Sequence, residues 1–83
     1  MLTRLLYASR AAEKIDDALL KSIFERSRAN NLEHGITGVL CVYHGGNIFL
    51  QALEGSRVAV NALYCDIVRD PRHRDVTLLD YAE

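Results

Sequence analysis

Apolar residues recur at two different spacings along the chain, one typical of strands and one typical of helices. Four stretches read as strands: "LTRLLYAS" near the start, "ITGVLCVYH" and "NIFLQALE" on either side of Gly45-Gly46, and "DVTLLDY" near the end. The two middle strands are separated by a short turn, and we expect them to pair antiparallel. Glycine tolerates the positive φ that such a turn needs, so Gly45 and Gly46 are expected to supply it.

Two helices are predicted between these strands. The first has a cap at Asp16 or Asp17, ends at Asn30-Asn31 before Gly35, and carries its apolar residues at helical spacing: Ile15, Leu19, Leu20, Ile23 and Phe24. The second is capped by Ser56, stops at Asp70-Pro71, and carries one apolar stripe: Val60, Leu63, Tyr64, Ile67 and Val68.

The order strand, helix, strand, strand, helix, strand predicts an α+β fold. With right-handed crossovers it gives a ferredoxin-like split βαβ sandwich (βαββαβ), with one mixed, mostly antiparallel sheet and both helices on one face. The other sheet face is apolar as well, and nothing in the chain covers it. We therefore expect a homo-oligomer that forms through this exposed sheet face.

Composition narrows the class of protein. The chain has 83 residues, 49% of them hydrophobic and 25% charged, with a net charge of −1, which fits one globular domain over residues 1–83. No basic surface for nucleic acid, no secretion signal and no membrane span is apparent. Two cysteines, Cys41 and Cys65, are too few for a disulfide scaffold, so we expect a cytoplasmic protein.

No catalytic or metal-binding motif stands out. Cys41 and His44 are three residues apart, which on a strand places them on opposite faces, so a shared metal or a nucleophilic pair is not expected. The carboxylates have no spacing that demands acid–base catalysis, and no glycine-rich phosphate loop is present. The domain is therefore not expected to be an enzyme.

Gln51 is unusual because it places a primary amide on a strand face that is expected to be buried. It shares a strand face with Phe49 and Leu53, and a buried amide without a partner costs about 1–3 kcal/mol. Tyr7 carries a phenol with the same need, and Asn31 places a second amide at a helix end, although asparagine is also a common helix terminator. A flat heterocycle between the two helices would satisfy these groups.

The sequence resembles the BLUF domain, a blue-light sensor module that binds flavin. The resemblance rests on "RLLYASRA", "SRANNLEHGITGVL", "IFLQALEG" and "DIVRDPRH", which occur in this order and with matching spacing over almost the whole chain. Each stretch alone is short, but four together form a specific pattern.

The resemblance implies a photochemical pair and a flavin pocket. Tyr7 would donate an electron and a proton to excited flavin, and Gln51 would bridge the Tyr7 hydroxyl and the flavin N5/O4 edge, then rotate or tautomerise. The cofactor would be FAD, with FMN or riboflavin as alternatives. The implied flavin-binding residues are Asn31 and Asn30 at the ring edge, Ser27, Ile23 and Phe49 around the ring, and Asp70, Arg72 and His73 near the ribityl-phosphate.

One departure from the family pattern concerns the end of the chain. Family domains continue into a fifth strand that usually carries Trp and Met, whereas this sequence ends at Glu83 and contains no Trp, so we expect a C-terminally incomplete domain. Its output would lie in another domain or a downstream protein. The alternative function is a non-photoactive ferredoxin-like interaction or dimerisation domain, and a small acyl-phosphate hydrolase comes third.

Overall fold

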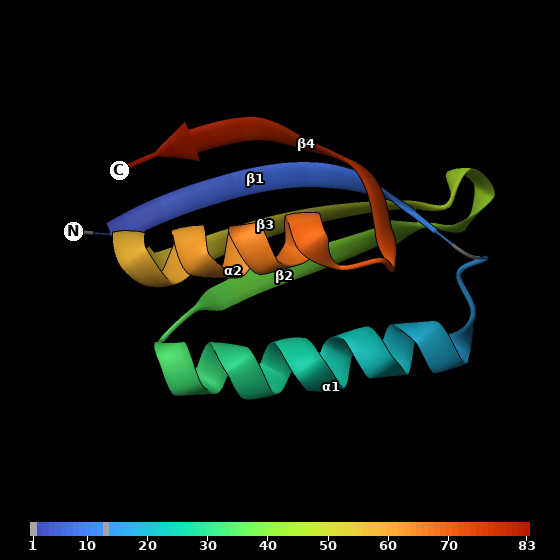
Figure 1. The fold of residues 1–83 in the computed structure, drawn as a ribbon, viewed down its shortest axis with the longest axis horizontal. Helices are drawn as coiled ribbons and strands as arrows, with labels where there is room; N and C mark the ends of the chain where they lie inside the picture. Colours follow the sequence, from blue (N-terminus) through green and yellow to red (C-terminus); the bar gives the residue numbers. More distant parts are fainter. Residues whose placement is uncertain (1, 13) are drawn as a thin grey trace.

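The computed structural model describes the backbone of residues 2–12 and 14–83, and of positions 26, 27, 30, 32, 33 and 44 it describes the backbone only. The elements follow the predicted order (Figure 1). They are β1 (Leu2–Ala11), α1 (Asp17–His34), β2 (Thr37–Tyr43), the short 3-10 helix η1 (His44–Gly46), β3 (Ile48–Ser56), α2 (Arg57–Arg69) and β4 (His73–Ala82).

The four strands form one sheet in the order β2-β3-β1-β4, and all three pairings are antiparallel. The βαββαβ architecture is thus confirmed, but the sheet is not mixed. The reason is that each helical crossover passes over one strand: β3 lies between β1 and β2, and β1 lies between β3 and β4. The two strands of each crossover run parallel without being neighbours, so no parallel pair forms.

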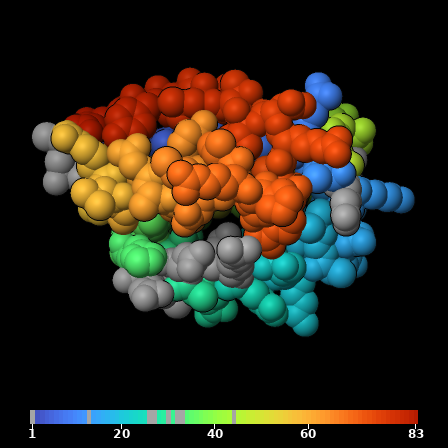
Figure 2. Space-filling model, in the orientation of Figure 1, coloured from blue at the N-terminus to red at the C-terminus, as the bar shows by residue number. Residues whose placement is uncertain are grey.

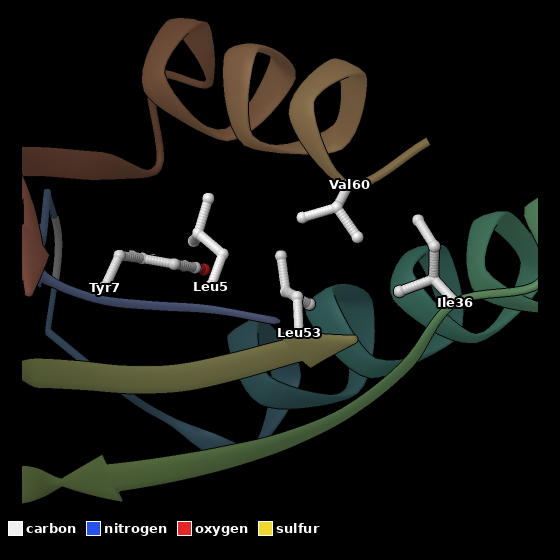
Figure 3. Packing of buried hydrophobic residues seen from close by; sticks show 5 residues of the cluster. All are labelled: Leu5, Tyr7, Ile36, Leu53 and Val60. Carbon is white, nitrogen blue, oxygen red and sulfur yellow. The ribbon is translucent and has the colours of Figure 1, made fainter. Parts of the chain in front are cut away.

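Alternation along β1 and β3 separates a helix-covered sheet face from an open one. In β1 the buried residues occupy odd positions and include Leu5 and Tyr7, and in β3 they include Gln51 and Leu53. Leu5 and Leu53 pack with Val60 of α2 in one cluster (Figure 3). A second cluster, formed by Ala11, Ile15, Ile23 and Phe49, lies under the first half of α1.

The helix ends follow local chemistry. The Asp16 side chain accepts a hydrogen bond from the Leu19 backbone N–H at 2.8 Å, and Ser56 caps α2 in the same way. Ile15 lies just outside α1 rather than within it, in the position of a hydrophobic staple. The helix also continues beyond Asn31 to His34 and ends at Gly35, whose φ is 68°.

The turn between β2 and β3 corrects one expectation. Gly45 and Gly46 lie in η1, and the residue with positive φ is Asn47, at 53°. Asn47 is held by long-range bonds, because its Oδ1 accepts from the Ile15 N–H at 3.1 Å and its carbonyl accepts from the Ala11 N–H at 2.8 Å. Asparagine tolerates the left-handed region better than most residues.

The last strand begins at His73, two residues earlier than its sequence pattern suggested, and shows irregular register against β1. Asp75 adopts a φ of 50° where the register shifts. None of the helices that the structure describes is both long and apolar enough to cross a membrane.

Candidate functional site

Tyr7 and Gln51 face each other across the two central strands. They are directly paired in the β1–β3 register, and both side chains lie on the helix-covered face. The Tyr7 hydroxyl donates to Gln51 Oε1 at 2.5 Å, and the two residues are 1% and 7% exposed. Within the described part of the chain, nothing accepts a hydrogen bond from the other end of the amide, Gln51 Nε2.

Two cavities open beside α1, one between α1 and α2 and the other between α1 and the sheet, and they meet at Leu40 and Gln51. The smaller, of about 50 Å³, also borders Tyr7 and Ile23 and is called here the inner cavity. The larger, of about 520 Å³, lies beside the second half of α1 and is called the outer groove. The surface between α2 and α1 is visibly hollowed on the face shown in Figure 2.

Asn31 contributes an amide to the outer groove. Its backbone carbonyl accepts the N–H groups of Gly35 and Ile36, so the main chain closes the helix end. Its side-chain Oδ1 is buried and has no hydrogen-bond partner. A buried acceptor without a donor is uncommon in folded proteins, and this one lines the same groove as Gln51. The side chain therefore does not serve as a helix cap.

The loop after α2 places a charged pair in the wall of the inner cavity. The Arg72 guanidinium binds both carboxylate oxygens of Asp70, with the shortest contact, Nη2 to Oδ2, at 2.6 Å. Its Nη1 also donates to Ser22 Oγ of α1 at 3.2 Å, which connects α1 to the loop after α2. Hydrogen bonding to Arg72 lowers the pKa of the Asp70 carboxyl.

His73 lies at the sheet side of the same cavity. Its Nδ1 is 2.8 Å from Ser9 Oγ, and its ring is 5.2 Å from the ring of Phe49. Burial lowers the pKa of this imidazole, and the nearby Arg72 lowers it further, while Asp70 opposes both. The neutral imidazole is therefore the favoured form.

The electrostatics of Tyr7 also favour its neutral form. Burial raises the pKa of the phenol well above its usual range, and the neighbouring Tyr64 and Asp70 add to the shift. The Tyr64 ring centroid lies 5.8 Å from that of Tyr7. The phenol thus keeps its proton in the ground state and acts as a donor to Gln51.

Most of the residues that the sequence predicted for the site border one of the two cavities. Tyr7, Ile23, Gln51, Asp70, Arg72 and His73 border the inner cavity, and Asn31 and Gln51 border the outer groove. Phe49 borders neither, because it is fully buried behind Ile23 in the second core cluster. The side chains of Ser27 and Asn30 lie outside the described residues, so their predicted roles stay predictions.

Several site residues were missed from the sequence. Ser9 shares a strand face with Tyr7, and that alternation could have suggested its contact with the site. The remaining lining residues carry ordinary helix, strand or loop patterns that give no such signal; they are Phe24, Arg28, Ile36, Gly38, Leu40, Leu63, Asp66 and Ile67.

Comparison with known proteins decides the family. Residues 2–83 match the family described as BLUF, "Sensors of blue-light using FAD". The chain belongs to the BLUF family. BLUF domains are sensory modules that bind flavin, and the ferredoxin-like fold described above is the BLUF fold.

The similar proteins include both light-regulated enzymes and small sensors. This BLUF chain is 40% identical over 81 residues to the photoactivated adenylate cyclase subunit beta of Euglena gracilis, and covers 98% of itself but 9% of that protein. The dark-state structure of the BLUF protein BlrB superposes with a TM-score of 0.88 at 38% identity, covering 96% of this chain and 59% of that one. A bacterial light-regulated adenylyl cyclase gives a TM-score of 0.89 at 36% identity, with coverage of 98% and 23%. The chain thus spans only a part of these relatives.

The geometry of this BLUF domain fits a flavin. An isoalloxazine ring carries acceptors and an N–H along one edge, and the groove is lined by Asn31, whose Oδ1 has no partner, and by Gln51, whose Nε2 remains available as a donor. Between them they offer one acceptor and one donor, with Leu40 and Ile36 supplying apolar walls. These residues would hold the ring, with Tyr7 one hydrogen bond further in.

Proposed function

We propose that this domain binds a flavin between α1 and α2 and reports blue light through a change in the Tyr7–Gln51 hydrogen bond. The observation that carries the proposal is the geometry of that pair: a protonated phenol donates to the amide oxygen of Gln51, and Gln51 also lines the groove. One side chain thus touches both the phenol and the place of the ligand.

A bound flavin would absorb blue light and exchange an electron and a proton with its surroundings. In darkness Tyr7 holds its proton on Oη, since its raised pKa disfavours spontaneous ionisation. Departure and return of that proton would remove and restore the donor that orients the Gln51 amide. During that interval the amide can rotate or tautomerise, and the hydrogen-bond pattern then differs while the flavin is chemically unchanged.

The proposed cofactor is FAD, as in the family description, with FMN and riboflavin as alternatives. Ile23 and Leu63 from the two facing helices are expected to cover the ring, because both border the inner cavity. Ser27 and Asn30 remain predicted ring contacts from the family resemblance alone. Asp70, Arg72 and His73 are proposed to close the polar end of the cavity.

The output is proposed to lie outside this domain. The similar cyclases carry enzymatic activity in long chains of which this sequence matches a small part. Another relative, at 40% identity over 87 residues, is a blue light- and temperature-regulated antirepressor of Escherichia coli. We therefore expect a signal transmitted to another domain or protein, with no catalysis by the residues described here.

The test is an absorption spectrum after reconstitution with FAD, before and during blue illumination. The wild-type domain should bind FAD and show a reversible spectral shift. Tyr7→Phe should bind FAD equally and lose the shift, because the ring still packs while the transferable proton is gone. Tyr43→Phe, an exposed tyrosine on the open sheet face, is the matched control and should behave like wild type.

Two outcomes would contradict the proposal in different ways. A normal shift in Tyr7→Phe would remove this residue from the mechanism. Failure of the wild-type domain to bind any flavin would favour the alternative, a ferredoxin-like interaction domain without a chromophore.

A further inference from the structure

We propose that Arg28 binds the phosphate group of the flavin nucleotide and makes the domain prefer FMN and FAD over riboflavin. This inference rests on the proposed function and adds to it a residue that selects among flavins. The family resemblance predicted the phosphate near Arg72 and His73, whereas the proposed phosphate position is beside Arg28.

The position of Arg28 on α1 supports this role. Phe24, Arg28 and Asn31 follow one another at intervals of four and three residues, so they share one helix face, and all three line the outer groove. Asn31 is the residue with the unpartnered amide oxygen. Arg28 therefore lies about one turn of helix from the expected ring edge, which is within reach of a ribityl chain and its phosphate.

The guanidinium of Arg28 is available for a ligand. Its side chain is exposed, and the described residues offer it no ion pair or hydrogen bond. A planar guanidinium with free N–H groups can bind a phosphate through two parallel hydrogen bonds. The described residues that line the outer groove include no carboxylate, so none of these residues repels an anion.

Arg72, the competing cation, is already engaged. Its guanidinium binds both oxygens of Asp70 and also Ser22, and the Arg72 and Asp70 side chains are 24% and 12% exposed. The inner cavity that it borders contains a second carboxylate, Asp66. Two carboxylates beside one arginine and a neutral histidine make that end unfavourable for a phosphate dianion.

The experiment measures binding of riboflavin, FMN and FAD to the whole chain by equilibrium dialysis in darkness, at about 50 mM salt. The wild-type domain should bind FMN roughly five- to tenfold more tightly than riboflavin, the size expected for one partly exposed charged contact. Arg28→Gln should reduce this ratio to about one and leave the Kd for riboflavin unchanged. Raising the salt should also reduce the ratio in wild type.

Lys21→Gln is the matched control, because Lys21 is an exposed cation of the same helix that borders neither cavity. It changes the net charge equally and should preserve the FMN preference. An unchanged ratio in Arg28→Gln, or an equal loss in Lys21→Gln, would overturn the inference while riboflavin binding still supported the proposed function. Failure of all three flavins to bind wild type would refute both.

Discussion

At the scale of single residues, Tyr7 and Gln51 depend on each other for their buried hydrogen bond. The phenol donates to Gln51 Oε1, and no other described residue accepts from it. Tyr7 is held in place by packing against Tyr64 and the first core cluster, so it cannot turn to water. The stability of this pair can therefore be measured without any flavin.

Gln51→Leu is expected to destabilise the flavin-free domain by about 1–3 kcal/mol, because it leaves the buried Tyr7 hydroxyl without an acceptor. Adding Tyr7→Phe to this variant should recover most of the loss, since both partners are then apolar. Denaturant unfolding of the two single variants and the double variant gives the coupling energy. Simple additivity of the two changes would show that the bond contributes nothing in solution.

Asn31→Ala separates ligand binding from helix stability. The side chain has no partner to lose and alanine is the better helix former, so the flavin-free domain should keep its melting temperature or gain slightly. Flavin affinity should fall by about 1–3 kcal/mol, because a ring edge loses its partner in a buried site. Flavin titration and thermal melting of the same variant test both halves.

Asn61→Ala is the control for this comparison. Asn61 lies on α2, borders neither cavity, and donates to the Arg57 carbonyl at 2.9 Å and to Tyr81 Oη at 3.2 Å. It should lower the melting temperature without changing flavin affinity. If Asn31→Ala behaved in the same way, its amide would have a structural role only.

At the scale of elements, the sequence predicted the helix ends, because these depend on side chains within one turn of the chain. Asp16, Ser56 and Gly35 act within one turn of the chain, so their roles at the helix ends could be predicted. The turn after β2 could not, because Asn47 is fixed by a hydrogen bond from Ile15, 32 residues away. A glycine pair permits positive φ but does not require it.

The candidate site shows the same division. Alternation placed Tyr7 and Gln51 on the covered face, but only the register of β1 against β3 sets them opposite each other. The contacts of His73 with Ser9 and of Arg72 with Ser22 join residues 64 and 50 positions apart. Such pairings depend on how the elements pack, which residue spacing does not reveal.

The first residue of β4 should make stability depend on pH. The pKa of His73 in the folded domain is lowered from 6.5, chiefly by burial, so the folded state favours the neutral ring. This contribution is complete above about pH 6.5 and is lost as the pH falls through the lower folded pKa. The free energy of unfolding should therefore decrease as the pH falls below about 6.5.

His73→Asn should flatten that part of the pH profile, because the titrating ring is gone. His34→Asn, at the exposed end of α1, should leave the profile like that of wild type. An equally steep decrease in both variants would assign the effect to other groups.

At the scale of the whole molecule, the open sheet face carries exposed apolar side chains that the proposed flavin site does not use. The exposed apolar residues there come from β2 and β3 and are Val39, Tyr43, Ile48 and Leu50. The same face also carries one ion pair, between Arg4 and Glu54, at 3.1 Å. Contiguous apolar surface of this kind is uncommon on monomers. The homo-oligomer expected from the sequence remains a prediction, and this face is where we expect it to form.

Sedimentation at low micromolar concentration should show self-association, most simply a two-fold dimer. Leu50→Lys should shift the protein to monomer, because it places a charge within the apolar face. Val58→Lys is the control, since Val58 of α2 is 81% exposed on the helix side. A wild-type domain that sediments as a clean monomer would remove the predicted oligomer.

The placement of Tyr7 and Gln51 also affects how often their hydrogen bond breaks spontaneously in darkness. Both residues belong to β1 and β3, the two strands with neighbours on either side, and they form a direct cross-strand pair. Central strands open only in rare, near-global fluctuations, whereas loops and helix ends open often. A pair mounted on loops would part and re-form with ordinary thermal motion, and each such event would resemble a signal. Fixing both members to the most rigid part of the sheet suppresses these false events, so in the proposed mechanism the background activity of the sensor is set by side-chain rotation alone.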